Sequence, residues 1–456
     1  MKTLGVPPPR FMSASRFMLP GGAASVYLDA LRGIAAFGVL VHHWQDVFSF
    51  GAPSDFKRFS FNYWLHALLG LGHQWVVVFF VMSGYLVGGT VLRSVAQGRW
   101  SLGKYALTRG TRLYIVLIPA LILGALVDWS GIHLLHAAAP LYRGQAGVLS
   151  VHFDVASRLH LSTFVGNALF LQTIHLPFTA HAIQTFGSNG PLWSLAYEFW
   201  FYVGFPLLVF TLKPATKLST RLICLGSLIL WVLFTGPAIS LLWLIWLMGV
   251  ALHFLPRLPV LHTNFGLASV SFILLSSVVV LKAVHPYNEA AGGVYWTDFV
   301  FGIVVTAFLY SLIHWKGHAM PASAESVAKH AASSSYTLYL VHLPALIFLR
   351  GWLQPPGAGQ PAAFELLPSL LAVLVVFAYA QMVYYLFERN TVRVRNWLGD
   401  IRWKEMLEIA ESFQAGRSHE RLVTRAIAEE TKTTGIRMPP RSETVASIGP
   451  AAKRLE

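Results

Sequence analysis

The sequence predicts an all-α fold, a polytopic bundle of about ten transmembrane helices with both chain termini in the cytoplasm. The 456 residues are 55% hydrophobic and only 12% charged, which is more apolar surface than the interior of a soluble domain can hold. The apolar residues form continuous runs of about 20, the length that crosses about 30 Å of hydrocarbon as a helix. Transmembrane β-strands would instead appear as short alternating segments, so a β-barrel is excluded.

Ten apolar runs are expected to cross the membrane. They cover residues 27–48, 63–92, 105–127, 192–212, 219–236, 238–255, 264–284, 295–314, 333–353 and 363–388. The apolar stretch 161–176 is short, and we expect it to lie in the membrane interface. The runs divide the chain into a cytoplasmic N-terminal segment (1–26), a membrane domain (27–395) and a basic cytoplasmic tail (396–456). In the tail we expect a helix near 401–430 and then a disordered polar end.

The distribution of basic residues predicts the orientation. Lys and Arg concentrate in the connections 93–112 and 213–221 and in the tail from Arg389 onward, and such loops stay in the cytoplasm. The long segment 128–191 therefore faces outward. This sorting also accounts for the formal net charge of +14, so we expect no nucleic-acid partner.

We expect neither a metal site nor an internal disulfide. The single cysteine, Cys224, lies in an apolar run and can form no internal disulfide and no Cys-based metal site. The outward segment carries several histidines whose spacings match no common set of metal ligands. They are His133, His136, His152, His160, His175 and His181.

The first span carries the most informative residues, an arginine and a histidine within the apolar run 28–50. A charged group in hydrocarbon is costly and therefore marks a functional site. Eleven residues at about 100° each bring His43 to within about 20° of Arg32, about 16 Å farther along the same helical face. His42 falls about 80° away from that face, so the two adjacent histidines are not equivalent.

Two carboxylates are candidate partners for His43. Glu198 lies in the fourth span and, like His43, is expected in the outer half of the membrane. An acid at that depth would orient the base and stabilise its protonated form. Asp46, three residues beyond His43 on the same helix, is the rival partner. The alternative interpretation is a structural ion pair, although buried pairs rarely improve stability.

Four further residues are candidates for substrate binding. Arg109 and Arg112 begin the third span three residues apart on one face. Their guanidinium groups suit phosphate oxygens, but anchoring of the span at the cytoplasmic surface explains them equally well. Ser83 lacks the Gly-x-Ser-x-Gly context of a nucleophile, so we interpret it as packing or ligand lining. His342, considered alone, is explained by a hydrogen bond to a neighbouring helix.

Together these segments resemble the acyltransferase-3 family of integral membrane O-acyltransferases. The resemblance covers about residues 25–395 and rests on an ordered set of motifs. These are Leu28-Asp29-Ala30-Leu31-Arg32-Gly33 with Arg32-x10-His43, Phe79-Phe80-x-x-Ser83-Gly84-Tyr85, Arg109-x-x-Arg112, Trp193-Ser194-Leu195-x-x-Glu198-x-x-x-Tyr202, Tyr339-Leu340-x-His342 and Phe387-Glu388-Arg389. Asn390 departs from the family pattern, which usually has Pro there. We expect no appended extracytoplasmic esterase-like domain.

The resemblance implies transfer of an acyl group, commonly acetyl, from acyl-coenzyme A to a hydroxyl. The implied acceptor is a carbohydrate or glycolipid outside the cytoplasm, a cell-surface polysaccharide or a lipid-linked sugar. The protein is then expected in the bacterial inner (plasma) membrane, among lipids. By the resemblance His43 is the catalytic histidine and Arg32 its companion, Arg109 and Arg112 match a second arginine motif, and Glu198 and His342 are site candidates.

The expected mechanism places the phosphates of coenzyme A at Arg109, Arg112 and Arg32, with the thioester reaching His43. His43 would take the proton of the acceptor hydroxyl, helped by Glu198 or Asp46. Direct attack needs no covalent intermediate, and an acyl-histidine is the alternative.

A proton-coupled transporter of an anionic or acylated solute is the alternative function, because intramembrane Arg, His and Glu also line proton paths. Inverted repeats would favour a transporter, and none is evident in the sequence. A non-catalytic scaffold would leave the intramembrane charges unexplained. The sequence leaves open the acceptor, the acyl group and whether the chain forms a homo-oligomer.

Overall fold

The computed structural model describes residues 22–48, 57, 60–175, 181–256, 258–284, 296–315, 317–353 and 366–400. Within these residues the chain is helical, and its β-structure is limited to one isolated bridge between Gln172 and Ile183. The predicted all-α class is confirmed. Residues up to Thr391 form one compact unit, and the helical residues 392–400 belong to a second. The predicted tail helix near 401–430 lies outside the described residues.

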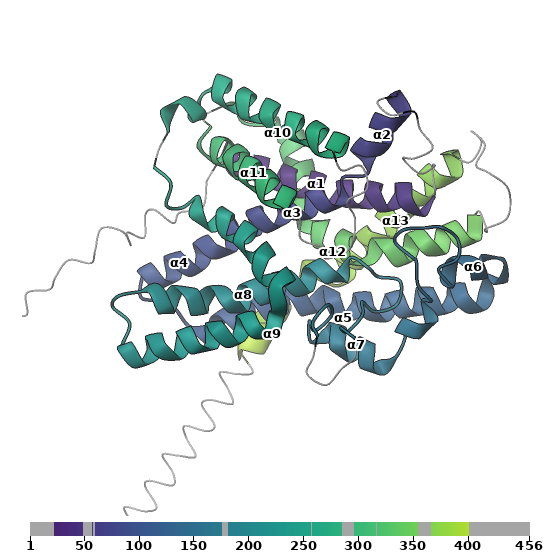
Figure 1. The fold of residues 1–456 in the computed structure, drawn as a ribbon, viewed down its shortest axis with the longest axis horizontal. Helices are drawn as coiled ribbons and strands as arrows, with labels where there is room; N and C mark the ends of the chain where they lie inside the picture. Colours follow the sequence, from purple (N-terminus) through teal and green to yellow (C-terminus); the bar gives the residue numbers. More distant parts are fainter. Residues whose placement is uncertain are drawn as a thin grey trace, which may run out of the picture. The chain divides into compact units, whose positions relative to one another are not determined.

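The described part of the chain contains nine helical segments long and apolar enough to cross a membrane, consistent with a multi-pass membrane protein. Figure 1 shows how they lie. The second segment is composed of α2 (Phe61–Leu69), α3 (Gly72–Ser83), the π-helical turn η4 (Gly84–Gly88) and α4 (Gly89–Ala96). The others are α1 (Ala23–Val47), α5 (Leu102–Leu134), α8 (Leu192–Leu212), α9 (Leu218–Ala251), α10 (Asn264–Val284), α11 (Trp296–His314), α12 (Ala322–Leu353) and α13 (Leu366–Leu386).

Helix α9 contains both the fifth and the sixth predicted spans, joined at a break. Gly236 has φ 76° and ψ 178°, outside the helical region, and Pro237 follows it. Glycine adopts positive φ readily, and proline has no backbone N–H to donate to a preceding helical turn. The chain can therefore leave the helical path here without a large local cost.

The two halves of α9 run in opposite directions. Along the first half, Arg221 Nε donates to Thr211 O at the end of α8, and Trp231 Nε1 donates to Trp200 O nearer its start. The first half is therefore antiparallel to α8. Along the second half, a Cβ on Gly84 would meet Trp246, and one on Gly88 would meet Val250, so this half runs with the second span.

The second span itself runs parallel to α8, because His73 stacks on Trp193 and Ser83 bonds to Glu198. The chain therefore reverses direction at Gly236. Counted this way, the nine segments of the described chain make the ten crossings that the sequence predicts.

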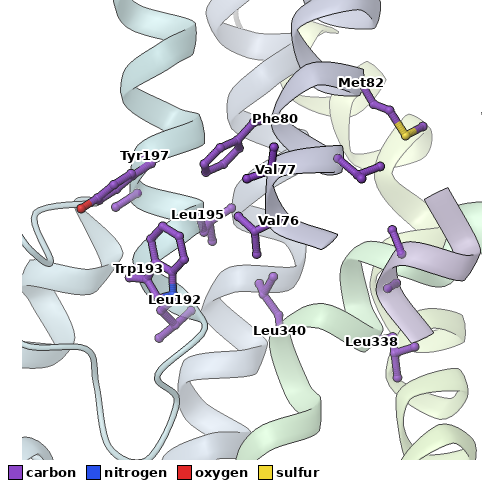
Figure 2. Close-up of a cluster of buried hydrophobic side chains, with 14 of the residues drawn as sticks. Val76, Val77, Phe80, Met82, Leu192, Trp193, Leu195, Tyr197, Leu338 and Leu340 are labelled. Atoms are coloured by element: carbon purple, nitrogen blue, oxygen red, sulfur yellow. The ribbon is translucent and has the colours of Figure 1, made fainter. Parts of the chain in front are cut away.

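Small residues allow the central helices to approach closely. A Cβ on Gly33 of α1 would lie 2.6 Å from the Ala331 Cβ of α12, and one on Gly84 would lie 1.9 Å from Trp246 O. Apolar side chains of α3, α8 and α12 fill the space beside these crossings (Figure 2). The close approach expected at Ser83-Gly84 is therefore observed. The π-helical turn follows Ser83 directly, and such turns often occur at functional sites.

The segment between α5 and α8 is mostly irregular. It contains η5 (His136–Ala138), α6 (Ala139–Tyr142), η6 (Ala156–Arg158) and α7 (Leu161–Ala168). Helix α7 has only 8 residues and is too short to span a membrane, as expected for the stretch 161–176. One of these loops, residues 143–155, reaches the end of α1 and contributes to the candidate site.

Candidate active site

His43 lies where α1, α12 and the loop 143–155 meet. Its Nδ1 is 3.0 Å from Ser150 Oγ. Its ring centroid is 5.1 Å from that of His342 and 4.8 Å from that of His42. The structure thus brings together two of the intramembrane histidines that the sequence identifies, from the first span and the ninth. Ser150 was not foreseen, because a contact across 107 positions leaves no signal in local patterns.

Asp46 acts on His43 through the loop. Its Oδ1 accepts a hydrogen bond from Leu149 N at 3.0 Å, and its Oδ2 accepts one from Ser150 N at 2.7 Å. A carboxylate that receives two backbone N–H groups holds that backbone firmly, because charge-assisted hydrogen bonds are the strong ones. Asp46 therefore positions Ser150, and Ser150 contacts the histidine.

Further contacts hold the same loop in place. Val155 N donates to Tyr142 O at 2.9 Å, and the Arg158 guanidinium lies 3.1 Å from the centroid of the Phe153 ring. Burial of Arg158 disfavours its charged form and lowers its pKa to about 10. The loop that carries Ser150 is therefore anchored at both ends and in the middle.

The two ring nitrogens of His342 differ in protonation and in hydrogen bonding. Nδ1 lies 3.0 Å from Leu338 O and 2.9 Å from Tyr339 O. A carbonyl oxygen only accepts, so Nδ1 carries the proton and Nε2 is an acceptor. The side chain is 1% exposed, and Nε2 has no hydrogen-bond partner among the described residues. The expected hydrogen bond to a neighbouring helix is therefore wrong, since both observed partners belong to α12.

Glu198 lies in a separate cluster of hydroxyl groups. Its Oε1 accepts hydrogen bonds from Ser83 Oγ at 2.7 Å and from the Tyr202 hydroxyl. Trp246 Nε1 in turn donates to Ser83 Oγ at 3.2 Å. Ser83 is thus a hydrogen-bonding partner of Glu198, as ligand lining or packing would require. The structure shows no hydrogen bond between Glu198 and His43, so the predicted dyad is not formed.

Arg112 is paired with the carboxylate of the last motif. Its Nη1 lies 2.5 Å from Glu388 Oε1, and its Cζ lies 5.3 Å from the centroid of the Tyr336 ring. Glu388 Oε2 accepts from Thr337 N at 3.0 Å, and the Glu388 residue is 3% exposed. The contact is an ion pair, since Glu388 Oε1 has no hydrogen-bond partner among the described residues, and the guanidinium of Arg112 has five N–H donors.

Arg109 and Arg32 also keep unused donors. Arg109 donates to Thr90 Oγ1 at 3.2 Å and lies 5.6 Å from the Tyr202 ring centroid. Arg32 pairs with Asp29 at 3.3 Å and is within electrostatic reach of Arg112. The Nε atoms of both Arg109 and Arg32 have no hydrogen-bond partner in the described chain. Guanidinium groups with spare donors can bind phosphate oxygens.

A ladder of polar rings on α12 connects the arginines with the histidines. Its rungs are Tyr336, Tyr339 and His342, each three residues after the last, so the ladder rises about 9 Å. Arg112 lies over the Tyr336 ring at one end, and His342 lies beside His43 at the other. The two candidate ends of the site are therefore joined along one helix.

A second buried polar cluster lies outside this ladder. His73 Nε2 is 3.0 Å from Asp298 Oδ1, and Lys282 Nζ donates to Gly70 O at 2.6 Å. With Gln74 these side chains border a cavity of about 10 Å³, room for about one water molecule. Sequence reasoning overlooked this cluster, although charges at the ends of two apolar runs could have indicated it. The described residues contain no group of three or more His, Cys, Asp or Glu side chains arranged to hold a metal ion.

Comparison with known proteins gives a family match and several relatives. A family model described as an acyltransferase domain, Acyl_transf_3, matches residues 25–386. A protein of Staphylococcus aureus (strain COL) named "Putative O-acetyltransferase" is 23% identical over 398 residues, which cover 81% of this chain and 58% of that protein. The "O-acetyl transferase" of Shigella phage Sf6 is 26% identical over 283 residues, 59% of this chain and 71% of that protein.

The chain thus spans little more than half the length of the staphylococcal relatives that it matches. No solved structure matches it significantly.

Proposed function

The chain belongs to the acyltransferase family that Acyl_transf_3 describes, and from this premise we propose that it is a multi-pass membrane O-acyltransferase. The proposed reaction moves an acyl group, commonly acetyl, from acyl-coenzyme A to a hydroxyl of an acceptor outside the cytoplasm. The observation that carries the proposal is His43, held by Ser150 at one end of a polar ladder that has arginines at its other end. The names of the relatives support O-acetyl transfer.

The donor binds first to the arginines in this proposal. Arg32, Arg109 and Arg112 offer guanidinium N–H groups to the phosphates of coenzyme A at the cytoplasmic mouth. The acyl-bearing arm extends along the α12 ladder until its thioester lies beside His43. Ser83 and Glu198 line the inner part of this route, and His342 lines its end.

His43 acts as the general base. With Nδ1–H donating to Ser150 Oγ, its Nε2 is free to take the proton of the acceptor hydroxyl. The hydroxyl oxygen forms a bond to the acyl carbon, the carbon–sulfur bond breaks, and His43 returns the proton to the departing sulfur. General-base assistance of this kind contributes about 10²–10⁴-fold to the rate. Asp46 assists indirectly by fixing Ser150, and direct attack requires no acyl-histidine.

The proposed acceptor is a cell-surface polysaccharide or a lipid-linked sugar at the bacterial inner membrane. A decisive experiment supplies acetyl-coenzyme A with a labelled acetyl group to inside-out membrane vesicles that contain the protein. We expect base-labile label, the signature of an O-acetyl ester, in the carbohydrate or glycolipid fraction. His43→Ala should abolish it.

The proton-coupled transporter predicts a different result in the same vesicles. Label would then accumulate inside them without forming an ester, and a collapsed proton gradient would abolish the uptake. That outcome would contradict the proposed acyl transfer.

A further inference from the structure

The most unusual atom of the site is Nε2 of His342. It is an acceptor, because Nδ1 donates its proton to the carbonyl groups of Leu338 and Tyr339. His342 is only 1% exposed, and its Nε2 has no hydrogen-bond partner among the described residues. A buried acceptor without a donor costs about 1–3 kcal/mol. Such an atom beside a catalytic base points to a substrate group that completes it.

The missing donor must belong to a group that lies close to the reacting atoms. The ring centroids of His342 and His43 are only 5.1 Å apart. The reacting hydroxyl cannot serve both histidines, because it has one proton and gives it to His43. A second N–H or O–H on one of the two substrates can supply this donor.

The donor substrate offers such a group at the right place. In acyl-coenzyme A two carbons separate the thioester sulfur from an amide nitrogen. When the thioester lies beside His43, this amide N–H lies only a few ångströms away. His342 is also the last rung of the ladder that leads from Arg112, whereas Ser150 approaches His43 from the outward loop. The arrangement favours contact of His342 with the donor.

We propose that His342 Nε2 accepts a hydrogen bond from the amide N–H of acyl-coenzyme A nearest the sulfur. The inference rests on the proposed function and goes further, because it assigns one ligand atom to one protein atom. The bond fixes the arm just before the thioester and so places the acyl carbon opposite His43. His342 is in this sense a donor-recognition residue as well as a neighbour of the base.

The test compares two ligands that differ in one group. The first is coenzyme A, and the second is an analogue in which an ester oxygen replaces that amide N–H. Binding of both to the purified full-length protein in nanodiscs is measured for the parent, for His342→Phe and for His342→Asn. Ser335→Ala is the matched control, because it changes another buried side chain of α12, whose hydroxyl donates to Ala332 O, without touching Nε2.

We expect the parent to bind the analogue about 5- to 150-fold more weakly than coenzyme A, because the analogue leaves the buried Nε2 without a donor at a cost of about 1–3 kcal/mol. His342→Phe should bind both ligands equally, because it has no acceptor. His342→Asn should recover part of the preference through its amide oxygen. Ser335→Ala should keep the full preference.

Other outcomes distinguish failure of this inference from failure of the proposed function. If the parent binds coenzyme A but does not distinguish the analogue, the inference is wrong and the proposed function stands. If the parent does not bind coenzyme A, both the function and the inference fail. The parent comparison needs no variant, so misfolding of His342→Phe leaves the test intact.

Discussion

Replacing Ser150 tests whether the loop 143–155 orients His43, the proposed base. Ser150→Ala removes the hydroxyl that lies 3.0 Å from His43 Nδ1. The backbone N–H that bonds to Asp46 Oδ2 at 2.7 Å is kept, so the loop should stay in place. We expect the change to leave His43 present but less well oriented.

The expected loss of rate follows from the one hydrogen bond that the substitution removes. A neutral hydrogen bond contributes about 0.5–1.5 kcal/mol, which corresponds to about 2- to 13-fold in rate. The loss should appear in kcat, because Ser150 contacts the base. The KM for acetyl-coenzyme A should change little, since Arg112 contacts the opposite end of the ladder, about 9 Å along α12 from His342. Ser150→Thr keeps a hydroxyl and should recover much of the activity.

The matched control is Ser157→Ala. Ser157 also lies between α5 and α8, and its hydroxyl donates to Asp154 O at 2.6 Å without contacting His43. The measurement is the initial rate of acetyl transfer over a range of acetyl-coenzyme A concentrations. Parent-like kcat in Ser150→Ala would refute the reasoning, and so would an equal loss in Ser157→Ala.

Three further predictions concern topology, the base and the donor site. In a Cys224→Ala background, a cysteine at position 145 should react with an impermeant thiol reagent added outside, and one at position 99 should not; the reverse pattern would overturn the orientation. His43→Ala should remove nearly all acyl transfer at unchanged membrane levels, whereas His42→Ala should be milder because only His43 contacts Ser150; equal losses would contradict the helical-face argument. Arg112→Lys should keep a cation beside Glu388 yet weaken coenzyme A binding about 10- to 100-fold, because lysine lacks the fork. Glu388→Gln should instead lower stability by about 1–3 kcal/mol, because it removes the buried carboxylate that pairs with Arg112; the Arg112 side chain is 36% exposed and keeps part of its hydration. Thermal unfolding of the purified variants separates the two effects.

The sequence by itself determined the helical membrane architecture. Whether a segment enters hydrocarbon depends on its own composition and length, so local runs suffice to locate the spans. Even the reversal within α9 could be predicted, because the two runs on either side of residue 237 are each long enough to cross. The alignment of Arg32 and His43 on one face follows from helix geometry alone.

Tertiary structure alone decided which of these residues meet. Glu198 bonds to Ser83 and Tyr202 rather than to His43, because depth in the membrane does not say which neighbouring helix a side chain faces. Arg112 pairs with Glu388 because α5 contacts the short helix η9 (Glu388–Asn390) that follows α13. Helical periodicity gives the face of each helix, but rotation and pairing of faces depend on contacts with all the other helices.

The contact of Ser150 with His43 shows most clearly what local sequence patterns leave undetermined. Asp46 attracts two backbone N–H groups of a loop that lies beyond the third span, and the path of that loop is set by its own anchors at Tyr142 and Arg158. No pattern in either segment records the other, since backbone N–H groups are the same at every residue except proline. Only the folded chain brings the hydroxyl to the histidine.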